Sequence, residues 1–375
     1  MLQIEEVLTR SQLKKFVDYP NQLYRNVPQF VPATYADDLE DWDREKNPAF
    51  AYCEARCWLA VRNNEIVGRI GAIISHRANE KWNTNRMRFT QVDFIDDKEV
   101  SAALFGVAEA WAKEKGCDEI HGPLGFTDMD REGMLVDGFE HRSMFITYYN
   151  HPYYIEHLTK LGYVKDVDWI ENLLTIPKDD DVCKRLKRFS DLSLRRYHLH
   201  LAEAKHQKDF IPLIPAFFRL VNLCYSPLYS TVELSEEQIS RYAKKFAPLI
   251  NPKLSAFVMD ENNEMIAMGV GAPSLASALQ KSHGKYLPFG WARMLKALYV
   301  NDTIDLLLIG VHPDYQAKGV NAIVMNKLLE GCHAMGITKA ETGPTLELNS
   351  KVLSQWKGFD KLQHKRRRCF IKKLQ

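Results

Sequence analysis

The two halves of this chain carry the same landmarks in the same order, and this repeat limits the folds open to it more than any other feature. In the first half, two apolar segments rich in β-forming residues flank a polar turn at residues 62–65. In the second half, two similar segments flank the turn at residues 260–264, and both turns contain Asn-Asn-Glu. Two such segments around a short polar turn predict a β-hairpin. Self-similarity over so long an offset indicates a duplicated domain.

Further landmarks follow each hairpin. An apolar strand leads into an amphipathic helix that ends at a glycine, the usual left-handed stop. A strand ending in Gly-Pro comes next, and then an asparagine, a short helix and a Gly-aromatic-x-Lys segment that leads into a last strand. The first copy has them at residues 89–95, 98–115, Gly116, Gly122, Asn150 and Gly162, and the second at 304–311, 320–335, Gly336, Gly343, Asn349 and Gly358. The sequence therefore predicts two α/β domains in tandem.

The boundary between the copies is marked by a proline and a charge run at residues 177–181, which interrupt the apolar pattern. We expect an N-terminal domain at residues 1–178, a basic linker or solvated helix face at 179–196, and a C-terminal domain at 197–375. The copies also differ in length, because the first carries an extra segment at about residues 124–148 and the second carries one at 276–301.

Composition narrows the class of protein. A length of 375 residues favours two domains over one. The formal net charge of +2 is too small for a dedicated nucleic-acid or membrane-surface protein. The first residues do not read as a leader, and no apolar run approaches the roughly 20 residues of a membrane helix. The seven scattered cysteines indicate reduced thiols rather than disulfides or a metal site. We expect a cytoplasmic protein with no metal and no membrane partner, and the small net charge disfavours a nucleic-acid partner.

Residues 309–322 carry the motif with the most chemical content. They join an apolar strand to an amphipathic helix through a turn that contains Gly319. Such a turn exposes unpaired backbone N–H groups at the positive end of the helix dipole, where a pyrophosphate would fit. The spacing matches neither a P-loop nor a dinucleotide-binding fingerprint. The alternative interpretation is a glycine that only shapes the turn.

At this motif the sequence resembles the GCN5-related N-acetyltransferases (GNAT proteins), whose pyrophosphate loop reads Gln/Arg-x-x-Gly-x-Gly/Ala. Gln316 and Gly319 match that pattern, and Asn321 departs from its last position. The order of elements is similar to the GNAT order once in each half, and segments 150–154 and 310–315 look like those of bacterial proteins with two GNAT-like copies. The resemblance implies tandem GNAT folds, each with a mixed, mostly antiparallel sheet flanked by helices.

The resemblance also implies an activity. It predicts an N-acyltransferase that uses acetyl-CoA or another acyl-CoA and acts on a small amine or amino-acid-like acceptor. The cofactor-binding residues implied are Ile309, Gly310, Val311, Gln316, Ala317, Lys318, Gly319, Val320, Asn321, Ala322 and Asn349. For Asn349, a helix N-cap is an equal alternative.

The first copy has a different loop at the corresponding point. Residues 96–100 contain three carboxylates and no glycine, which makes a sound helix cap but would repel a pyrophosphate. By resemblance to other two-copy proteins, we expect the first copy to wall the acceptor pocket, with Tyr148, Tyr153 and Tyr154 as lining residues. Half-buried packing is the alternative role for each tyrosine.

Acyl transfer to an amine needs a neutral amine, donors for the developing oxyanion and an acid for the departing thiolate. The resemblance gives the donors to the backbone near residues 309–311. Candidate bases are Asp305, Glu341 and Glu347, with a solvated surface carboxylate as the alternative for each. Where GNAT proteins often carry a tyrosine acid, this sequence has Trp356, and an indole cannot serve as that acid.

Two other hypotheses remain open. Asn321 and Trp356 also fit a non-catalytic ligand-binding or scaffold protein with the same fold. The basic segments 184–196 and 361–373 also fit a transferase that takes aminoacyl-tRNA. The sequence contains no signal for the oligomeric state.

Overall fold

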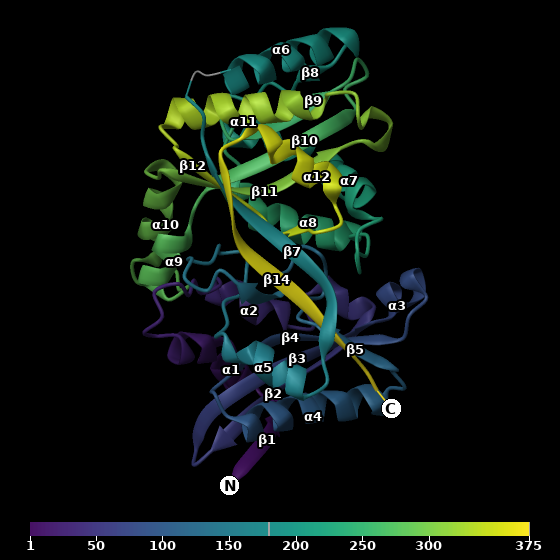
Figure 1. The fold of residues 1–375 in the computed structure, drawn as a ribbon, viewed down its shortest axis with the longest axis vertical. Helices are drawn as coiled ribbons and strands as arrows, with labels where there is room; N and C mark the ends of the chain where they lie inside the picture. Colours follow the sequence, from purple (N-terminus) through teal and green to yellow (C-terminus); the bar gives the residue numbers. More distant parts are fainter. Residues whose placement is uncertain (179–180, 375) are drawn as a thin grey trace. The chain divides into compact units, whose positions relative to one another are not determined.

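The computed structural model describes residues 1–178 and 181–374 and divides them into two compact units (Figure 1). Unit 1 comprises Met1–Ile170, Leu275–Met294 and the residues from His364 onward. Unit 2 comprises Glu171–Ser274 and Leu295–Gln363. Neither unit is a continuous stretch of sequence, so the units differ from the predicted domains 1–178 and 197–375.

Unit 1 is built on a mixed sheet with the strand order β1-β2-β3-β4-β5-β14. All neighbouring strands in it are antiparallel except β4 and β5, which are parallel. Its strands are β1 (Leu2–Glu6), β2 (Cys53–Arg62), β3 (Glu65–Ser75), β4 (Arg86–Phe94), β5 (Glu119–Gly122), β6 (Met134–Asp137) and part of β14 (Lys361–Lys373). Its helices are α1 (Arg10–Leu23), α2 (Tyr35–Asp41), η1 (Pro48–Ala51), α3 (His76–Trp82), α4 (Lys98–Glu114), α5 (Tyr153–Lys160) and α9 (Ala276–Ser282).

Unit 2 repeats this plan with the strand order β8-β9-β10-β11-β12-β7, in which β11 and β12 form the parallel pair. Its strands are part of β7 (Val164–Thr175), β8 (His200–Leu201), β9 (Ser255–Met259), β10 (Met265–Pro273), β11 (Thr303–Val311), β12 (Lys339–Thr342) and β13 (Thr345–Leu346). Its helices are α6 (Asp181–Arg196), η2 (Gln207–Leu213), α7 (Ile214–Tyr225), α8 (Glu236–Phe246), η3 (Ala247–Leu249), the end of α10 (Gly290–Tyr299), η4 (Pro313–Tyr315), α11 (Asn321–Met335), α12 (Ser350–Ser354) and η5 (Gln355–Gly358). The predicted mixed, mostly antiparallel α/β architecture and its duplication are confirmed.

A glycine in the same place of each unit lets the main helix approach the sheet. A Cβ added at Gly68 in β3 would come within 2.7 Å of Leu104 in α4. A Cβ added at Gly269 in β10 would come within 2.3 Å of Val324 in α11. Real side chains do not tolerate such distances, so both positions need glycine for close packing. This shared requirement is further evidence of duplication.

The two halves of the sequence exchange their last strands. In unit 1, the end of β14 pairs with β5, with Phe370 opposite Gly122. In unit 2, the end of β7 pairs with β12, with Leu174 opposite Ala340. The sequence pattern marks both segments as strands, but such a local pattern does not specify which of two similar sheets a strand will join. The exchange is the reason why the units are discontinuous in sequence.

The predicted linker is helical in its described part. Residues 181–196 form α6, and Cys183, Leu186 and Leu194 on its apolar face pack on the core of unit 2. Residues 179 and 180 lie outside the described part. Along 1–178 and 181–374, no helix is both long enough and apolar enough to pass through a bilayer.

Each central strand contains an irregularity in its pairing. In β4, Asp93 faces Arg69 whereas Thr90 faces Gly71, so β4 has one residue more than β3 between these pairs. Gln91, in this bulge, has φ of 41°. The pairing of β11 with β10 shifts in the same way between Val270 and Gly271. Bulges re-aim side chains and backbone groups, and they are common beside functional sites.

Candidate functional site

The turn before α11 in unit 2 presents free backbone donors. Gly319 and Ala317 adopt φ of 78° and 59°, which turns the chain sharply into the helix. Ala322 and Ile323 donate to the carbonyls of Gly319 and Val320. Among the described residues, the amides of residues 317–321 have no hydrogen-bond acceptor, and Ala317 and Lys318 are exposed. Because α11 is a full helix, these amides lie at its positive end and can bind an anion.

The space beside this turn is open. A Cβ added at Gly319 would meet a single neighbour, the Ser193 hydroxyl of α6, at 3.2 Å. The Lys318 ammonium lies 5.2 Å from the ring centre of Tyr315 and 5.7 Å from that of Tyr197. These aromatic contacts keep a positive charge at the turn. The corner is therefore neither filled by side chains nor neutralised by a nearby carboxylate contact.

Gln316 has a structural role in the same loop. The nitrogen of its side-chain amide donates to the carbonyl of Val311 at 3.2 Å, and the oxygen of that amide accepts from Lys351 of α12 at 3.0 Å. The side chain therefore ties the loop to the end of β11. Asn349, also predicted to bind cofactor, caps α12, because its side-chain oxygen accepts from the amide of Val352 at 3.3 Å.

Strand β11 separates from β12 before it reaches the turn. The two strands pair only from Thr303 to Leu306 on β11. Farther along, the carbonyl of Ile309 accepts from the Tyr225 hydroxyl at 3.2 Å, and that of Val311 accepts from the Cys224 thiol at 3.4 Å. The N–H and C=O of one strand residue point to the same side. The amides of Ile309 and Val311 therefore face away from β10, on the side where β12 has left the strand.

The three predicted bases lie at different depths. Asp305 in β11 is fully buried, in register with Glu341 of β12. Glu341 and Glu347 are half-buried. A carboxylate with no exposed surface cannot contact an acceptor amine without rearrangement, so Glu341 and Glu347 are the more accessible candidates. Their catalytic roles remain predictions.

Trp356 belongs to the core of unit 2. It is buried in one cluster with Leu329 and Ile337, and its ring centre lies 6.0 Å from that of Phe359. The position where a tyrosine acid was expected is therefore a packing position. Tyr225, which the sequence analysis did not select, is the hydroxyl that reaches the separated edge of β11 from α7.

In unit 1, carboxylates occupy the equivalent turn. Asp97 accepts from the amides of Glu99 and Val100 at 2.8 and 3.4 Å, and its other oxygen binds Arg62 at 2.7 Å. The hydrogen bond from Arg62 holds the pKa of Asp97 below its usual value. Asp96 contacts His157 at 3.0 Å. The first amides of α4 are thus bound by the protein's own anion.

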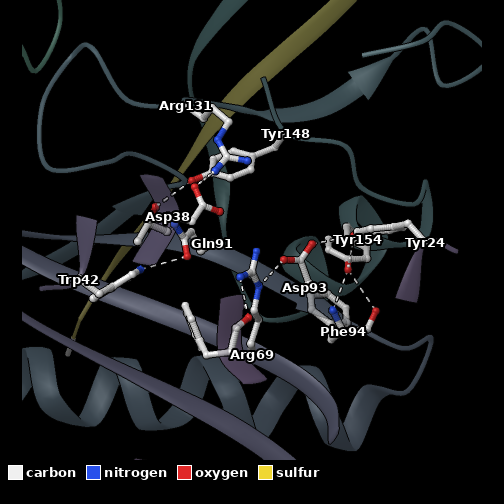
Figure 2. A network of polar contacts seen from close by, with 12 residues as sticks. Tyr24, Asp38, Trp42, Arg69, Gln91, Asp93, Phe94, Arg131, Tyr148 and Tyr154 are labelled. Atoms are coloured by element: carbon white, nitrogen blue, oxygen red, sulfur yellow. Dashed lines mark hydrogen bonds and ion pairs between the residues drawn. The ribbon is translucent and has the colours of Figure 1, made fainter. Parts of the chain in front are cut away.

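Unit 1 instead contains a polar pocket beside β4. Figure 2 shows the network of polar contacts to which several of its lining residues belong. The wall of the pocket includes two ion pairs, Arg69 with Asp93 and Arg131 with Asp38. The Arg69–Asp93 pair is 2.6 Å long, and its side chains are only 2% and 7% exposed. Phe30, Val31 and Tyr35 add apolar and aromatic surface to the same pocket. The pocket therefore combines apolar wall with fixed charges of both signs.

Of the three predicted tyrosines, Tyr148 lines this pocket. The Arg131 guanidinium lies 4.7 Å from its ring centre, and burial raises the pKa of its hydroxyl to about 12. Tyr154 is fully buried, with its hydroxyl bonded to Tyr24 and to the backbone of Phe94 (Figure 2). Tyr153 donates to the Phe94 carbonyl at 2.5 Å. These last two tyrosines fix the end of β4.

Sequence reasoning missed the four charged residues of the pocket wall, Asp38, Arg69, Asp93 and Arg131. A signal for one of them was present, because Arg69 interrupts an otherwise apolar run at residues 66–74. Burying a charge is costly unless it is paired, so a charge inside such a strand indicates a buried partner.

One cluster in unit 1 has the donor types of a metal site. The donor atoms of His121, Asp166 and Cys369 lie within 4.8 Å of one another. However, Arg86 lies 3.8 Å from the same Asp166 carboxylate. A guanidinium beside the carboxylate opposes a second cation there. We therefore assign no metal to this cluster.

Known proteins are similar to this chain in sequence and in structure. No family model matches the chain. Protein YghO of Escherichia coli (strain K12) is 26% identical over 381 aligned positions, which cover 99% of this chain and 95% of that protein. Bacterial ceramide synthase of Caulobacter vibrioides (strain NA1000 / CB15N) is 24% identical over 363 positions, covering 94% of this chain and 92% of that protein.

A similar solved structure is a tandem GNAT protein from the clavulanic acid biosynthesis pathway, solved without AcCoA. It matches 100% of this chain and 99% of its own with a TM-score of 0.55 at 11% identity. The protein therefore has a tandem GNAT-like fold, as the sequence predicted.

Proposed function

We propose that the protein is an acyl-CoA-dependent N-acyltransferase, with acetyl-CoA or another acyl-CoA as donor and a small amine or amino-acid-like molecule as acceptor. The observation that carries the proposal is the set of unpaired amides at residues 317–321, at the open start of α11. The GNAT-like fold supports it, because proteins of similar fold are described as GCN5-related N-acetyltransferases.

The residues at this corner fit an acyl-CoA. The amides of Ala317 to Asn321 would hold the pyrophosphate, and Lys318 would add a positive charge. The edge of β11 from Ile309 to Val311, which β12 leaves unpaired, would bind the extended pantetheine arm, whose amides need strand-like partners. Ala322 and Asn349 stay in the proposed set as residues that shape the helix start and the neighbouring α12.

The same edge supplies what acyl transfer requires. The amides of Ile309 and Val311 would donate to the oxyanion that forms when an amine attacks the thioester carbonyl. Tyr225 holds a hydroxyl 3.2 Å from the Ile309 carbonyl, where it could deliver a proton to the departing thiolate. Glu341 and Glu347 would accept the proton that the amine loses.

The pocket of unit 1 is proposed to bind the polar part of the acceptor. Arg131 and Asp38 offer both signs of charge, and Tyr148 offers a hydroxyl and a ring. One relative is named a ceramide synthase, and ceramide is a fatty amide, so the acceptors to be tested include amphiphilic amines.

Ligand-induced stabilisation tests the donor site. We expect acetyl-CoA or a longer acyl-CoA to stabilise the protein by about 2.7 kcal/mol at 100 times its Kd, and Gly319→Glu to abolish this response. Gly336→Glu is the matched control, because Gly336 ends the same helix with φ of 70° and open space around it. Loss of the response in both variants, or no response in the wild type, would refute the donor site.

Turnover is tested by following release of the CoA thiol with a panel of amines. Tyr148→Phe is expected to raise the acceptor's KM several-fold while leaving the KM for acyl-CoA unchanged. Tyr153→Phe is the control, since Tyr153 does not line the pocket but its hydroxyl, like that of Tyr148, forms a hydrogen bond. An equal effect of both variants on both substrates would contradict the acceptor assignment.

The non-catalytic alternative is favoured by two observations, the packing role of Trp356 and the burial of Asp305. It predicts acyl-CoA binding without turnover of any amine. The aminoacyl-tRNA alternative is weakened by β14, where Arg366 and Arg368 both bind Asp168. These arginines already form ion pairs inside unit 1. The alternative would be restored if the protein bound RNA and the binding weakened as the salt concentration rose.

A further inference from the structure

The segment that connects α9 to α10 in unit 1 exposes large apolar side chains in close succession. We call residues 281–294 the tip. Leu287 is 79% exposed, Phe289 66%, Trp291 54% and Tyr286 45%. Folded proteins seldom expose neighbouring large apolar side chains without a partner surface. The tip therefore requires an explanation other than packing of the core.

The base of the tip is fixed to the rest of unit 1. Gln280 donates to the carbonyls of Pro28 and Phe30 at 2.7 and 2.8 Å. The carbonyl of Gly284 accepts from the amide of Tyr35 at 2.9 Å, and a Cβ at Gly284 would clash with the carbonyl of Ala33 at 1.9 Å. The exposed side chains are thus presented by an anchored turn rather than by a loose chain end.

The tip is also held together internally. The amide of Trp291 donates to the carbonyl of Tyr286 at 2.9 Å, and that of Arg293 donates to Phe289 at 3.2 Å. The Arg293 guanidinium donates to the carbonyl of Lys281. These bonds set the start of α10 and keep the aromatic side chains at the outer end of the segment.

The charge around these side chains has one sign. Lys281, Lys285 and Arg293 lie in the tip, and Lys296 follows in α10. The sequence from residue 276 to residue 301 contains no aspartate or glutamate. Lys285 contacts Asp18 at 3.1 Å, and the other three basic residues have no such carboxylate among the ion pairs of the described chain. The tip therefore combines aromatic and aliphatic surface with net positive charge.

We propose that the tip docks on the surface of an anionic phospholipid bilayer. Tryptophan, tyrosine and phenylalanine favour the boundary between headgroups and acyl chains, and lysine and arginine are attracted to anionic headgroups. Docking of this kind requires no spanning helix. A second copy of the chain fits less well, because a two-fold contact would place the basic residues of both tips against each other without a carboxylate between them. The small overall charge of +2, from which we expected no membrane partner, hides this local arrangement.

Co-sedimentation of the full chain with vesicles tests the proposal. We expect binding to phosphatidylcholine vesicles that contain phosphatidylglycerol, weaker binding to pure phosphatidylcholine, and a loss of affinity as salt rises. The variant L287S/F289S/W291S is expected to bind anionic vesicles about tenfold or more less tightly. Lys281→Gln with Lys296→Gln is expected to reduce binding to anionic vesicles only.

The control variant is I211S/L348S, which removes two apolar side chains that are 56% and 81% exposed elsewhere. It should bind vesicles like the wild type. Thermal unfolding checks that each variant folds. If the triple variant does not fold, Leu287→Ser alone is tested in its place. A blue shift of tryptophan emission on adding anionic vesicles, lost in Trp291→Phe, would locate the contact.

Three results would overturn the proposal. The first is no binding to anionic vesicles, and the second is binding that the tip variants leave unchanged. The third is a dimer in gel filtration that disappears in the tip variants, which would assign the surface to a second copy. None of these results bears on the donor site at Gly319, so the two proposals fail separately.

Discussion

The helices α4 and α11 begin at equivalent points of the two units, just after the central strand, but their first amides meet different surroundings. In unit 1, Asp97 binds two of these amides and Arg62 neutralises its charge. In unit 2, the amides of residues 317–321 have no acceptor in the described parts of the chain. The same fold therefore provides one closed helix start and one that is open to an external anion.

The two units also differ in how their other polar groups are arranged. Unit 1 pairs its buried charges with one another, as in Arg69–Asp93 and Arg368–Asp168. Unit 2 leaves backbone donors along β11 and at the start of α11. A duplicated fold can divide its work in this way, because only one copy needs to keep the donor site.

The largest effect should come from the buried pair of unit 1. Arg69→Ala leaves the Asp93 carboxylate buried without its partner, and we expect the free energy of unfolding to fall by about 3–5 kcal/mol. Urea denaturation measures this. Arg56→Ala is the control, since its contact with Glu6 is long, at 3.7 Å, and partly exposed, and such pairs contribute about 0–1 kcal/mol. If Arg69→Ala and Arg56→Ala lowered the free energy of unfolding equally, the stability of unit 1 would not depend on its buried charge pair.

A second prediction concerns pH. Burial alone would raise the pKa of Asp168, but hydrogen bonds from Arg368 and Arg366 hold it below its usual value. The stabilisation is therefore present above the unfolded-state pKa of about 4 and is lost as pH falls below it. Asp168→Asn should cost about 2–3 kcal/mol at pH 7, and the difference from wild type should shrink at acid pH. A constant difference between pH 7 and pH 3 would contradict this.

The third prediction tests the closed helix start directly. Asp97→Ala removes a helix cap and should lower the free energy of unfolding by about 1 kcal/mol. Acyl-CoA stabilisation of the protein should stay unchanged in this variant, because the proposed donor site lies in unit 2. Chemical denaturation with and without acyl-CoA checks both parts, and a changed ligand response would break the contrast between the units.

The smallest effect is expected at Lys318. Its ammonium is exposed, so Lys318→Ala should weaken acyl-CoA binding by about 0.5 kcal/mol, and less at high salt. Titration calorimetry at two ionic strengths measures this. An effect that does not depend on salt would show that Lys318 acts through packing on Tyr197 and Tyr315.

The elements could be predicted from the sequence, because their signals are local. The helix at 98–115, its glycine stop and the recurring hairpin all appear where the periodicity indicated. The strands that pair with β7 and β14 could not be predicted, since strand pairing depends on contacts between distant segments of the chain. The same limit applied to Tyr148, Tyr153 and Tyr154, which look alike in sequence but have different partners in the structure.

The candidate site shows the same division. Gly319 was found because a glycine in a short turn between an apolar strand and an amphipathic helix is a local signal in the sequence. Arg131 and Asp38 were not found, because their pairing joins segments 93 residues apart. Tyr225 was missed for the same reason, as its hydroxyl reaches β11 from 84 residues away in the chain.

The exchange of last strands has a consequence for synthesis and for engineering. The sheet of unit 1 is completed by Phe370 to Lys373, which are translated long after the partner strand β5. The N-terminal half therefore cannot reach its final form until this distant segment has been synthesised. A gene cut between the halves would yield two fragments that each lack a strand, and mixing the fragments would be needed to restore either one.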